Sequence, residues 1–527
     1  MKARIWLICW LLLITLSLGM IGDWVYRIDP FFHYHKPNLS DYYYVLDNQR
    51  SQNDGICRHF DYNAIITGTS MTENFRTTEA DELFGCNFIK VAYAGGSYKE
   101  INDNIEKALR AKNIRIVIRG LDYNKLLSNV DDMITDPGVY PTYLYDNNVL
   151  NDIEYIFNRD VVFGRVYQMT VDKNQEGFLP GITSFDEYSR WQNNYTFGIN
   201  TVCPNGVELN KTSDDMHLSE EEKSMIVENI RENVTRVPDE FPDTQFFYFY
   251  TPYSAAWWCE QYNAGEMYKW LEAERTATEM IISHDNIHLF SFNNLFGLTK
   301  DLNNYKDSRH YAAWINSLIL KWMHDGTYQI TKDNYEEYLK SEQDYYTSFD
   351  FMSLNGQEDY EADYYAAALL NKELSGVEPL DVLNTSSVNL ELSGAECVSQ
   401  DGKNSFVDCH GTLERDSTSE DLISYIRDKG YIGVEFLINL DEGYNYLCFK
   451  GKKNKDQGRL LACVFGEDGE LVGIENIDYL SLDYESHQYV IDLSAVHGNV
   501  KVVLNGGYTD NLGSVDSNYQ FSDIIMY

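Results

Sequence analysis

Apolar, β-branched runs alternate with polar segments of helical periodicity from Tyr62 onward. Ile101, Ile105 and Leu109, for example, recur at helical spacing in YKEINDNIEKALRAK. The runs that indicate buried strands are YNAIIT, NFIKVAYA, IRIVIRGLDYN, TQFFYFYTPYS and NIHLFSFNN. Strands separated by helices predict an α/β fold with a mostly parallel sheet and helices on both faces. Active sites in such folds lie beyond the carboxyl ends of the strands.

The pattern changes in the C-terminal part of the chain. Short alternating runs separated by turns, such as YIGVEFLINL and VKVVLNGG, favour an antiparallel β-sandwich. We therefore expect an α/β domain over residues 24–375 and a β-sandwich over 376–527. A long aromatic-rich insertion at about 126–210 separates the third and fourth strands. It is either a cover over the sheet edge or an elaboration of the packing.

The N-terminus, residues 1–23, predicts a membrane anchor. An uncharged apolar run from Ile5 to Gly22 follows Lys2 and Arg4. The run is long enough to cross a bilayer, and the basic residues before it predict a cytoplasmic N-terminus. A cleaved signal peptide is the alternative, although no clear small-x-small cleavage site follows the run. In both cases the bulk of the chain lies outside the cytoplasm, and an uncleaved helix makes this a single-pass protein of the cell membrane.

The chain of 527 residues is strongly acidic, with a formal net charge of −40. This charge argues against nucleic acid as a partner, because phosphate backbones need a basic surface. Nine cysteines are scattered without the spacing of a zinc site, and His33 and His35 alone make no metal site. No metal or other cofactor is therefore expected. Outside the cytoplasm some cysteines can pair, for instance Cys397 with Cys409.

The stretch IITGTSMTENF, residues 65–75, places a serine where a buried strand turns into a helix. Gly68 permits a tight turn, and Ser70 stands at the junction. Such a junction lifts a hydroxyl above the sheet edge and points backbone N–H groups at the group that it attacks. The alternative is that Thr69 or Ser70 only caps the helix.

A serine nucleophile needs a base, and the base needs an orienting carboxylate. The segment DSRHYAAWINSLIL offers one compact candidate, because Asp307 and His310 stand three residues apart at the start of an expected helix. Both side chains then lie on one side, so that the carboxylate holds the tautomer of the imidazole while its other nitrogen faces Ser70. The alternative is that Asp307 caps the helix and His310 packs.

Taken in order, these residues resemble the SGNH (GDSL-like) hydrolase superfamily. Ser70, within Gly-Thr-Ser-Met, matches the nucleophile that the family has within Gly-Asp-Ser-Leu. Gly95 or Gly96 matches the glycine of the second block, whose N–H helps to bind the oxyanion. Asp307 and His310 match the last block. The resemblance implies a three-layer α/β/α sandwich with a parallel sheet.

The third block departs from the family pattern. It is normally Gly-x-Asn-Asp, but here residues 120–124 read Gly-Leu-Asp-Tyr-Asn. An ionised Asp122 cannot donate to an oxyanion, so the oxyanion hole is either built otherwise or weaker. Asn124 is a candidate substitute donor beside the N–H groups of Ser70 and the two glycines.

The resemblance covers about residues 58–345 and is nearest to a membrane-anchored branch of the superfamily. Relatives in that branch work in alginate O-acetylation and teichoic-acid D-alanylation. The resemblance therefore implies a serine O-acyltransferase or esterase that acts on a cell-surface or exported polysaccharide. It also implies a membrane-bound O-acyltransferase as a partner that exports the acyl group.

Two further features bear on sugar binding. Trp257 and Trp258, just after the fourth strand, either stack on a sugar ring or pack in the core. Tyr508, Asp510 and Asn511 form a polar and aromatic loop that either contacts a sugar or satisfies its own turn. Two alternatives to an enzyme remain at this stage. One is a catalytically inert glycan-binding protein, and the other is an adaptor for a membrane-bound O-acyltransferase.

Overall fold

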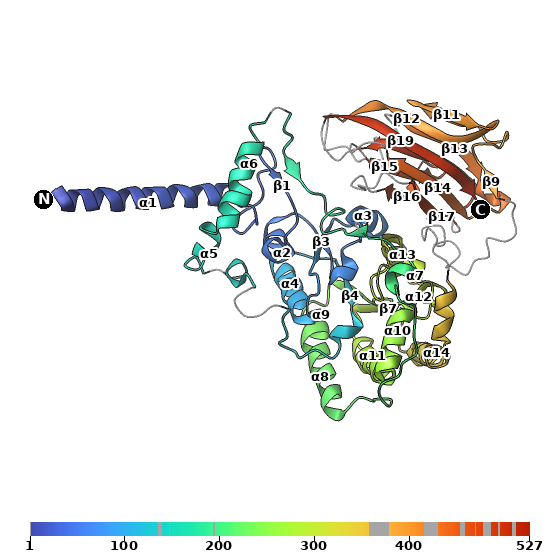
Figure 1. Ribbon diagram of the computed structural model, residues 1–527, viewed down its shortest axis with the longest axis horizontal. Helices are drawn as coiled ribbons and strands as arrows, with labels where there is room; N and C mark the ends of the chain where they lie inside the picture. The colour runs from blue at the N-terminus through green and yellow to red at the C-terminus, as the bar shows by residue number, and fades with distance from the viewer. Residues whose placement is uncertain are drawn as a thin grey trace.

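The structure, a computed structural model, holds an α/β part and a C-terminal part built of antiparallel sheets (Figure 1). It describes residues 2–134, 140–146, 148–175, 177–192, 195–357, 379–415, 430–453, 459–469, 471–477, 486–493, 496–508 and 513–527. The expected domain boundary at residue 376 and the expected helix ADYYAAALLNKEL lie outside the described residues.

One six-stranded sheet forms the centre of the α/β part, in the order β3-β2-β4-β6-β7-β8. Its strands are β2 (Ala64–Gly68), β3 (Phe88–Ala92), β4 (Ile116–Leu121), β6 (Gln245–Tyr250), β7 (Ile287–Ser291) and β8 (Gln329–Ile330). The first five pair in parallel, and β8 adds an antiparallel edge. Every residue of β2, β3 and β4 is buried, which is why these strands are predominantly apolar, with Lys90 and Arg119 as the charged exceptions. The predicted α/β class is confirmed.

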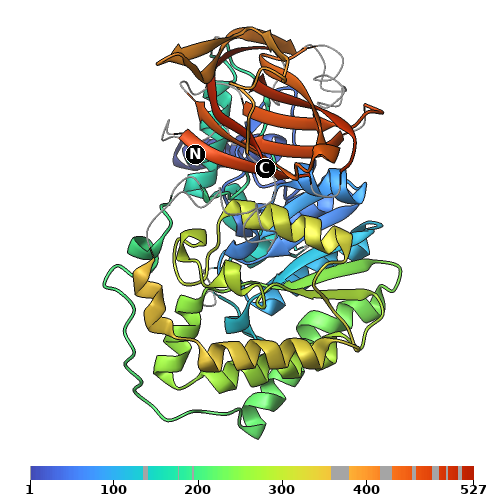
Figure 2. The same cartoon turned by 90° about the vertical axis from the view of Figure 1, so that its right-hand side faces the viewer.

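Helices cover both faces of this sheet (Figure 2). α3 packs against α13, whereas α8 and α14 pack against α11 on the other side. The helices of this part include α2 (Gln49–His59), α3 (Thr77–Phe84), α4 (Tyr98–Ala111), α8 (Glu220–Ile230), α10 (Ala255–Ala264), α11 (Met267–Ile281), α13 (Ala313–Asp325) and α14 (Tyr335–Ser348). Ser97 caps α4 by accepting the N–H of Glu100, and Ile101 and Ile105 form its buried face, as the periodicity predicts.

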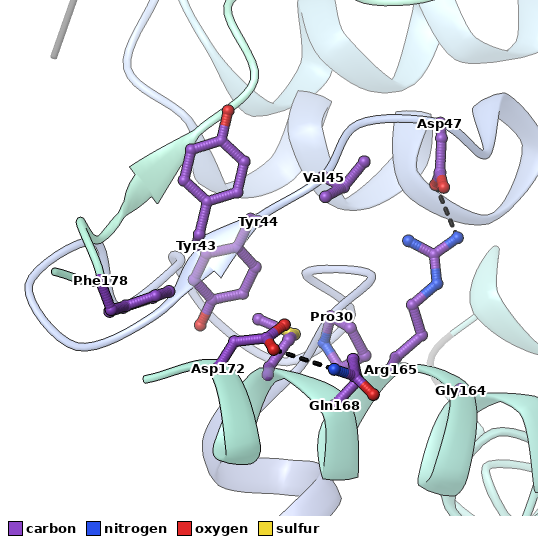
Figure 3. Close-up of a pocket in the computed structure, with 11 residues that line it drawn as sticks. Pro30, Tyr43, Tyr44, Val45, Asp47, Gly164, Arg165, Gln168, Asp172 and Phe178 are labelled. Atoms are coloured by element: carbon purple, nitrogen blue, oxygen red, sulfur yellow. Dashed lines mark hydrogen bonds and ion pairs between the residues drawn. The ribbon is translucent and has the colours of Figure 1, made fainter. Parts of the chain in front are cut away.

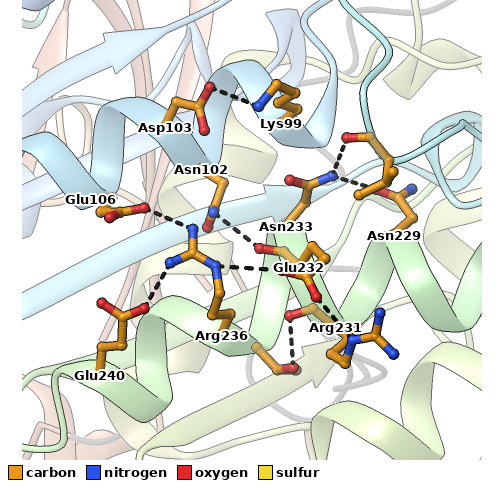
Figure 4. A network of polar contacts seen from close by, with 12 residues as sticks. Lys99, Asn102, Asp103, Glu106, Asn229, Arg231, Glu232, Asn233, Arg236 and Glu240 are labelled. Atoms are coloured by element: carbon orange, nitrogen blue, oxygen red, sulfur yellow. Dashed lines mark hydrogen bonds and ion pairs between the residues drawn. The ribbon is translucent and has the colours of Figure 1, made fainter.

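A polar network joins α4 to the segment that follows α8, namely η6 (Arg231–Thr235) and α9 (Arg236–Glu240) (Figure 4). Arg236 pairs with Glu106 of α4 and with Glu240, each at 2.7 Å. These ion pairs are partly exposed and add little to stability. The buried part of the network is more informative, because the amide of Asn229 donates to the carbonyl of Lys125 at 2.9 Å. This bond holds the chain directly after β4, where the third sequence block lies.

Two buried carboxyl groups share one polar cluster between α11 and α14. The Tyr338 hydroxyl lies 3.1 Å from Glu274 Oε1 and 3.0 Å from Glu342 Oε2, and neither glutamate is exposed. Burial raises the pKa of both carboxyls, and for Glu274 the neighbouring Glu342 raises the pKa further. The folded state therefore holds protons that the unfolded chain releases.

We expect the free energy of unfolding to fall as the pH rises above the ordinary glutamate pKa, about 4.3. Glu274→Gln removes one of the two ionising groups and keeps a hydrogen-bonding amide, so the variant should lose less stability than the wild type between about pH 5 and about pH 8. Chemical denaturation at both pH values measures the difference. An equal loss in the two proteins would contradict a raised pKa of Glu274.

The N-terminal helix α1 (Lys2–Ile28) is long and apolar enough to cross a membrane or to act as a signal sequence. It continues past the expected end at residue 23. Its last turn is part of the folded body, because Val25 and Ile28 are fully buried against the insertion. The predicted N-terminal segment therefore has no flexible joint at residue 23.

The C-terminal part consists of two antiparallel sheets, in the orders β10-β13-β18-β15-β16 and β11-β12-β19-β14-β17. Side chains of both sheets, such as Phe436 and Phe521, share one core, as in a β-sandwich. The strands are β10 (Leu390–Ser393), β11 (Ala395–Gln400), β12 (Lys403–Arg415), β13 (Gly433–Asn439), β14 (Tyr446–Lys453), β15 (Arg459–Phe465), β16 (Leu471–Ile477), β17 (Ser486–Asp492), β18 (Asn499–Tyr508) and β19 (Gly513–Met526), with β9 (Leu380–Asp381) beside β19.

Two predictions on this part have different outcomes. Cys397 and Cys409 form no disulfide, because they are offset in the β11–β12 ladder, where Cys397 stands opposite Val407. The suggested pairing is wrong. Asp510 and Asn511 lie outside the described residues, and Tyr508 ends β18 without a described side chain. The sugar-binding loop stays a prediction.

Candidate active site

Ser70 stands at the carboxyl end of β2, where the strand ends in a tight turn. Gly68 has a φ of +150°, and a Cβ at this position would lie 2.6 Å from Thr72 Cγ2. Glycine is therefore required both by the backbone and by the space. A single 3₁₀ turn follows, η1 (Ser70–Thr72), in place of the expected longer helix.

The cap of this turn and the candidate nucleophile are different residues. Thr69 Oγ1 accepts the N–H of Met71 at 3.4 Å, so Thr69 is the capping residue. The Ser70 hydroxyl is left for another partner, and its Oγ lies 2.7 Å from His310 Nε2. A serine hydroxyl within hydrogen-bonding distance of an imidazole is the first requirement of an activated nucleophile.

Asp307 and His310 lie in a loop between β7 and α13, not on a helix. A bridge between Tyr305 and Tyr311 closes the loop. Asp307 Oδ1 accepts the N–H groups of Arg309 at 2.9 Å and His310 at 2.8 Å. An aspartate that bonds its own backbone in this way favours a turn over a helix. The expectation that this pair starts the helix is wrong, although the two side chains still meet.

The Asp307 carboxylate holds the His310 ring. Nδ1 of the ring lies 2.8 Å from Asp307 Oδ2 and 3.0 Å from Oδ1. Burial alone favours the neutral carboxyl, but the hydrogen bonds from the ring and from the loop backbone lower the pKa of Asp307 to about 2. The carboxylate is ionised at neutral pH, so it accepts the proton of Nδ1 and leaves Nε2 as the acceptor toward Ser70.

Contacts with α13 and with the start of α10 fix these two loops. Tyr311 and Asn316 both donate to the carbonyl of Met71, at 3.3 and 3.1 Å, and so tie α13 to the serine turn. On the other side, the N–H and the hydroxyl of Ser254 donate to the carbonyl of Ser308 at 3.1 and 2.8 Å. The distance between Ser70 and His310 is therefore set by the fold around them.

A buried lysine joins the segment that follows the serine turn to the insertion. Nζ of Lys90, which is fully buried in β3, donates to the carbonyls of Phe75 at 2.9 Å and Asp186 at 3.2 Å. Burial lowers the pKa of Lys90 to about 7. No sequence motif indicated this residue.

The third sequence block serves as a support for the serine turn. Both carboxylate oxygens of Asp122 accept bonds from hydroxyls, namely Thr69 at 2.7 Å and Tyr253 at 2.8 Å. Asp122 is buried. The same Tyr253 hydroxyl lies 3.5 Å from Asn124 Oδ1. Asp122 thus holds the residue before Ser70, and Tyr253 places Asn124 next to this pair.

Three groups that follow the carboxyl ends of the neighbouring strands β2, β3 and β4 are candidates for binding an oxyanion. Within the described residues, the N–H groups of Ser70 and Gly95 and the amide nitrogen of Asn124 donate to no protein acceptor. The N–H of Gly96 donates to the carbonyl of Tyr93 at 2.7 Å, so it is used in the turn. Of the two glycines that match the second sequence block, Gly95 is therefore the one whose backbone N–H is available to an oxyanion.

A tryptophan from the insertion covers the Ser70–His310 pair. Nε1 of Trp191 donates to the Ser70 carbonyl at 3.1 Å, and its ring meets the His310 ring edge-on, with 5.6 Å between centres. Lys306 Nζ lies 4.1 Å from the Trp191 ring centre. Asn74 Oδ1 accepts the N–H of Trp191 at 3.1 Å. The aromatic richness of the insertion was visible in the sequence, but no motif singled out Trp191.

Trp257 and Trp258 are core residues. Each exposes 1% of its surface, and both rings stand close to Tyr123. Trp258 also stacks on Tyr346 at 4.6 Å. No ring face is left for a sugar, so the suggested stacking role is wrong and the packing alternative holds.

No protein-family model and no curated protein matches the chain. Among solved structures, it is similar to a Streptococcus pneumoniae protein provisionally described as a platelet activating factor (TM-score 0.27, 11% identity, 53% of this chain and 90% of that chain). It is also similar to a two-domain esterase (CEX) active on acetylated mannans (TM-score 0.19, 10% identity, 87% and 89%). A third is CsCBM6-3 from Clostridium stercorarium in complex with cellobiose (TM-score 0.16, 10% identity, 28% and 92%). At these TM-scores none of the likenesses carries an argument about this chain.

Proposed function

We propose that this chain is an SGNH-type serine hydrolase or O-acyltransferase that acts outside the cytoplasm on a cell-surface or exported polysaccharide. One observation carries the proposal. Ser70 Oγ lies 2.7 Å from His310 Nε2, while Asp307 Oδ2 lies 2.8 Å from Nδ1 of the same ring. A hydroxyl, an imidazole and a carboxylate in this order make up the machinery of acyl transfer through a serine ester.

In the first half of the proposed reaction, Ser70 Oγ attacks the ester carbonyl and His310 Nε2 takes the hydroxyl proton. The carbonyl oxygen becomes an oxyanion, which the N–H groups of Ser70 and Gly95 and the amide of Asn124 receive. Loss of one such donor typically costs about 10²–10³-fold in rate. The tetrahedral intermediate then expels the alcohol, which takes the proton from His310, and Ser70 is left as an acyl ester.

In the second half, a hydroxyl group of water or of a sugar attacks the acyl ester. His310 takes its proton, a second oxyanion forms in the same site, and the proton returns to Ser70 Oγ as the acyl group leaves. Water gives hydrolysis, and a sugar hydroxyl gives transfer. The cover of Trp191 over the pair limits the access of water on one side, which favours a sugar acceptor where one is bound.

Two features support a polysaccharide substrate outside the cytoplasm. The apolar helix α1 precedes the whole α/β part and is suited to anchor it to the membrane surface. The net charge of −40 disfavours polyanions and suits a neutral sugar polymer. A membrane-bound O-acyltransferase that delivers the acyl group is the proposed partner.

Acyl release from an O-acetylated polysaccharide tests the proposal. Full-length protein in detergent is incubated with this donor and with an unacetylated oligosaccharide, and free acetate and acetylated oligosaccharide are both measured. We expect acetyl groups to leave the donor with the wild type and to stay on it with Ser70→Ala. A folded wild-type protein that releases no acetyl group would favour the inert glycan-binding protein or the adaptor.

A further inference from the structure

The end of α1 marks the level at which a membrane surface would meet the folded body. The 27 residues of α1 span about 40 Å at about 1.5 Å per residue. About 20 apolar residues cross the hydrocarbon core of a bilayer. Counted from Ile5, where the apolar run begins, this length ends at Trp24. The residues around Gly22 and Trp24 are therefore at the outer interface when α1 spans the membrane.

Three helical segments of the insertion contact α1 at this level. They are α5 (Ile153–Ile156), η4 (Asp160–Val166) and α6 (Tyr167–Asp172). A Cβ on Gly22 would lie 3.5 Å from Ile156 Cγ2, and Trp24 Nε1 donates to Thr170 Oγ1 at 3.1 Å. Figure 1 shows α6 running across the end of α1. A helix in this position lies parallel to a membrane that α1 crosses.

These helical segments and the residues directly before α5 carry the most exposed apolar side chains of the folded body. Outside α1, five large apolar side chains among those described expose 60% or more, and four of them are in this region. We name the group the interfacial patch, and it consists of Val149, Leu150, Ile153, Phe157, Phe163 and Tyr167. Leu150 is 83% exposed. Exposed apolar side chains that are grouped in this way mark interaction or membrane-contact sites, whereas single ones are common on any surface.

Three polar side chains of η4 and α6 face a cavity instead. Arg165, Gln168 and Asp172 line a cavity of about 410 Å³ on the side of Tyr43 and Val45 (Figure 3). Arg165 pairs there with Asp47 at 2.6 Å. Neither Phe163 nor Tyr167 lines this cavity. This division into an apolar and a polar face is typical of a helix that lies in a membrane interface.

Hydrogen bonds fix the interfacial patch to the residues that follow α1. His33 Nε2 lies 3.2 Å from Asp152 Oδ1, and the Tyr155 hydroxyl donates to Asp29 at 2.8 Å. Arg58 of α2 donates to the carbonyl of Leu144 at 2.7 Å and so ties the insertion to the α/β part. The orientation of the patch therefore sets the orientation of the body.

We infer that the interfacial patch inserts into the outer surface of the lipid bilayer that α1 spans. The contact is apolar, because the net charge of −40 offers no general attraction to anionic headgroups. It holds the α/β part in one orientation relative to the membrane surface, so that this part does not rotate freely about α1. The inference is independent of the proposed chemistry, and it requires α1 to stay uncleaved.

Chemical access to one introduced cysteine at a time tests the inference. Leu150→Cys and, as a matched control, Leu437→Cys are made in the full-length protein and reconstituted into phosphatidylcholine vesicles with the body outside. Leu437 is 65% exposed in β13 of the C-terminal sheets. A membrane-impermeant maleimide is added, and peptide mass spectrometry measures labelling at each position. We expect labelling in Leu150→Cys to be at least about tenfold slower than in Leu437→Cys. Burial of one leucine side chain favours the inserted over the exposed state by about this ratio.

Equal labelling rates in the vesicles would overturn the inference. Protection that appears only in native membranes, and not with lipid alone, would overturn it in favour of a protein partner. Carbonate extraction of the vesicles reports separately whether α1 holds the protein in the bilayer. Acyl release is also measured with Leu150→Cys in detergent. This measurement tests the proposed catalysis without a membrane, so a failure of the catalysis can be distinguished from a failure of the membrane contact.

Discussion

Ser70→Ala is expected to lower kcat/KM for ester cleavage by about 10⁴–10⁶-fold, because no other hydroxyl replaces the attacking oxygen. The stability should change little. The Ser70 hydroxyl contacts only His310 among the described residues, and Thr69 supplies the cap of the turn. Initial rates with a p-nitrophenyl ester and thermal unfolding of the same sample measure the two effects.

Ser348→Ala is the matched control. Ser348 ends α14, and its hydroxyl donates only to carbonyls of its own helix, at 2.7 and 3.3 Å. This variant should keep the activity of the wild type. A Ser70→Ala protein that retains activity, with Ser348→Ala equally active, would show that the ester is cleaved elsewhere.

Asp307→Asn is expected to lower kcat by about 10⁴-fold while the protein stays folded. The asparagine Oδ1 can still accept the N–H groups of Arg309 and His310, so the turn is preserved. Its amide, however, donates to Nδ1 of His310 and so moves the ring proton to Nε2. The nitrogen that faces Ser70 then carries a proton and cannot accept another one.

Asp350→Asn provides the control for this change, since Asp350 caps η8 (Phe351–Gly356) through the same kind of bond, to the N–H of Met352 at 3.1 Å, and is outside the proposed site. Its activity should match that of the wild type. Asp307→Asn with a native melting temperature and a rate within about tenfold of the wild type would refute the orienting role of the carboxylate.

The strands were predictable because both faces of the sheet are covered. Complete burial makes β2, β3 and β4 predominantly apolar runs that end at glycine turns, and these runs place Ser70 at the sheet edge. Asp307 and His310 were found by their spacing. The sequence does not distinguish their loop from a helix start, because an aspartate three residues before a histidine suits a helix cap and a local turn equally well.

The remaining features depend on contacts that are distant in sequence. Trp191 reaches Ser70 across 121 residues, and nothing in its neighbourhood marks it. The supporting role of Asp122 depends on its two hydroxyl partners, Thr69 and Tyr253, which the sequence alone does not place beside it. Trp257 illustrates a general ambiguity, since an aromatic side chain after a strand suits a sugar site and a core alike. Only burial distinguishes the two.

Covalent labelling of the full-length protein with a fluorophosphonate tests the proposed nucleophile most directly. Mass spectrometry of the digested protein should find the phosphonyl group on Ser70 in the wild type, with labelling much slower in His310→Ala, because the imidazole activates the hydroxyl. Absence of the group from Ser70 in a folded wild-type sample, or equally fast labelling without His310, would contradict a catalytic Ser70–His310–Asp307 site.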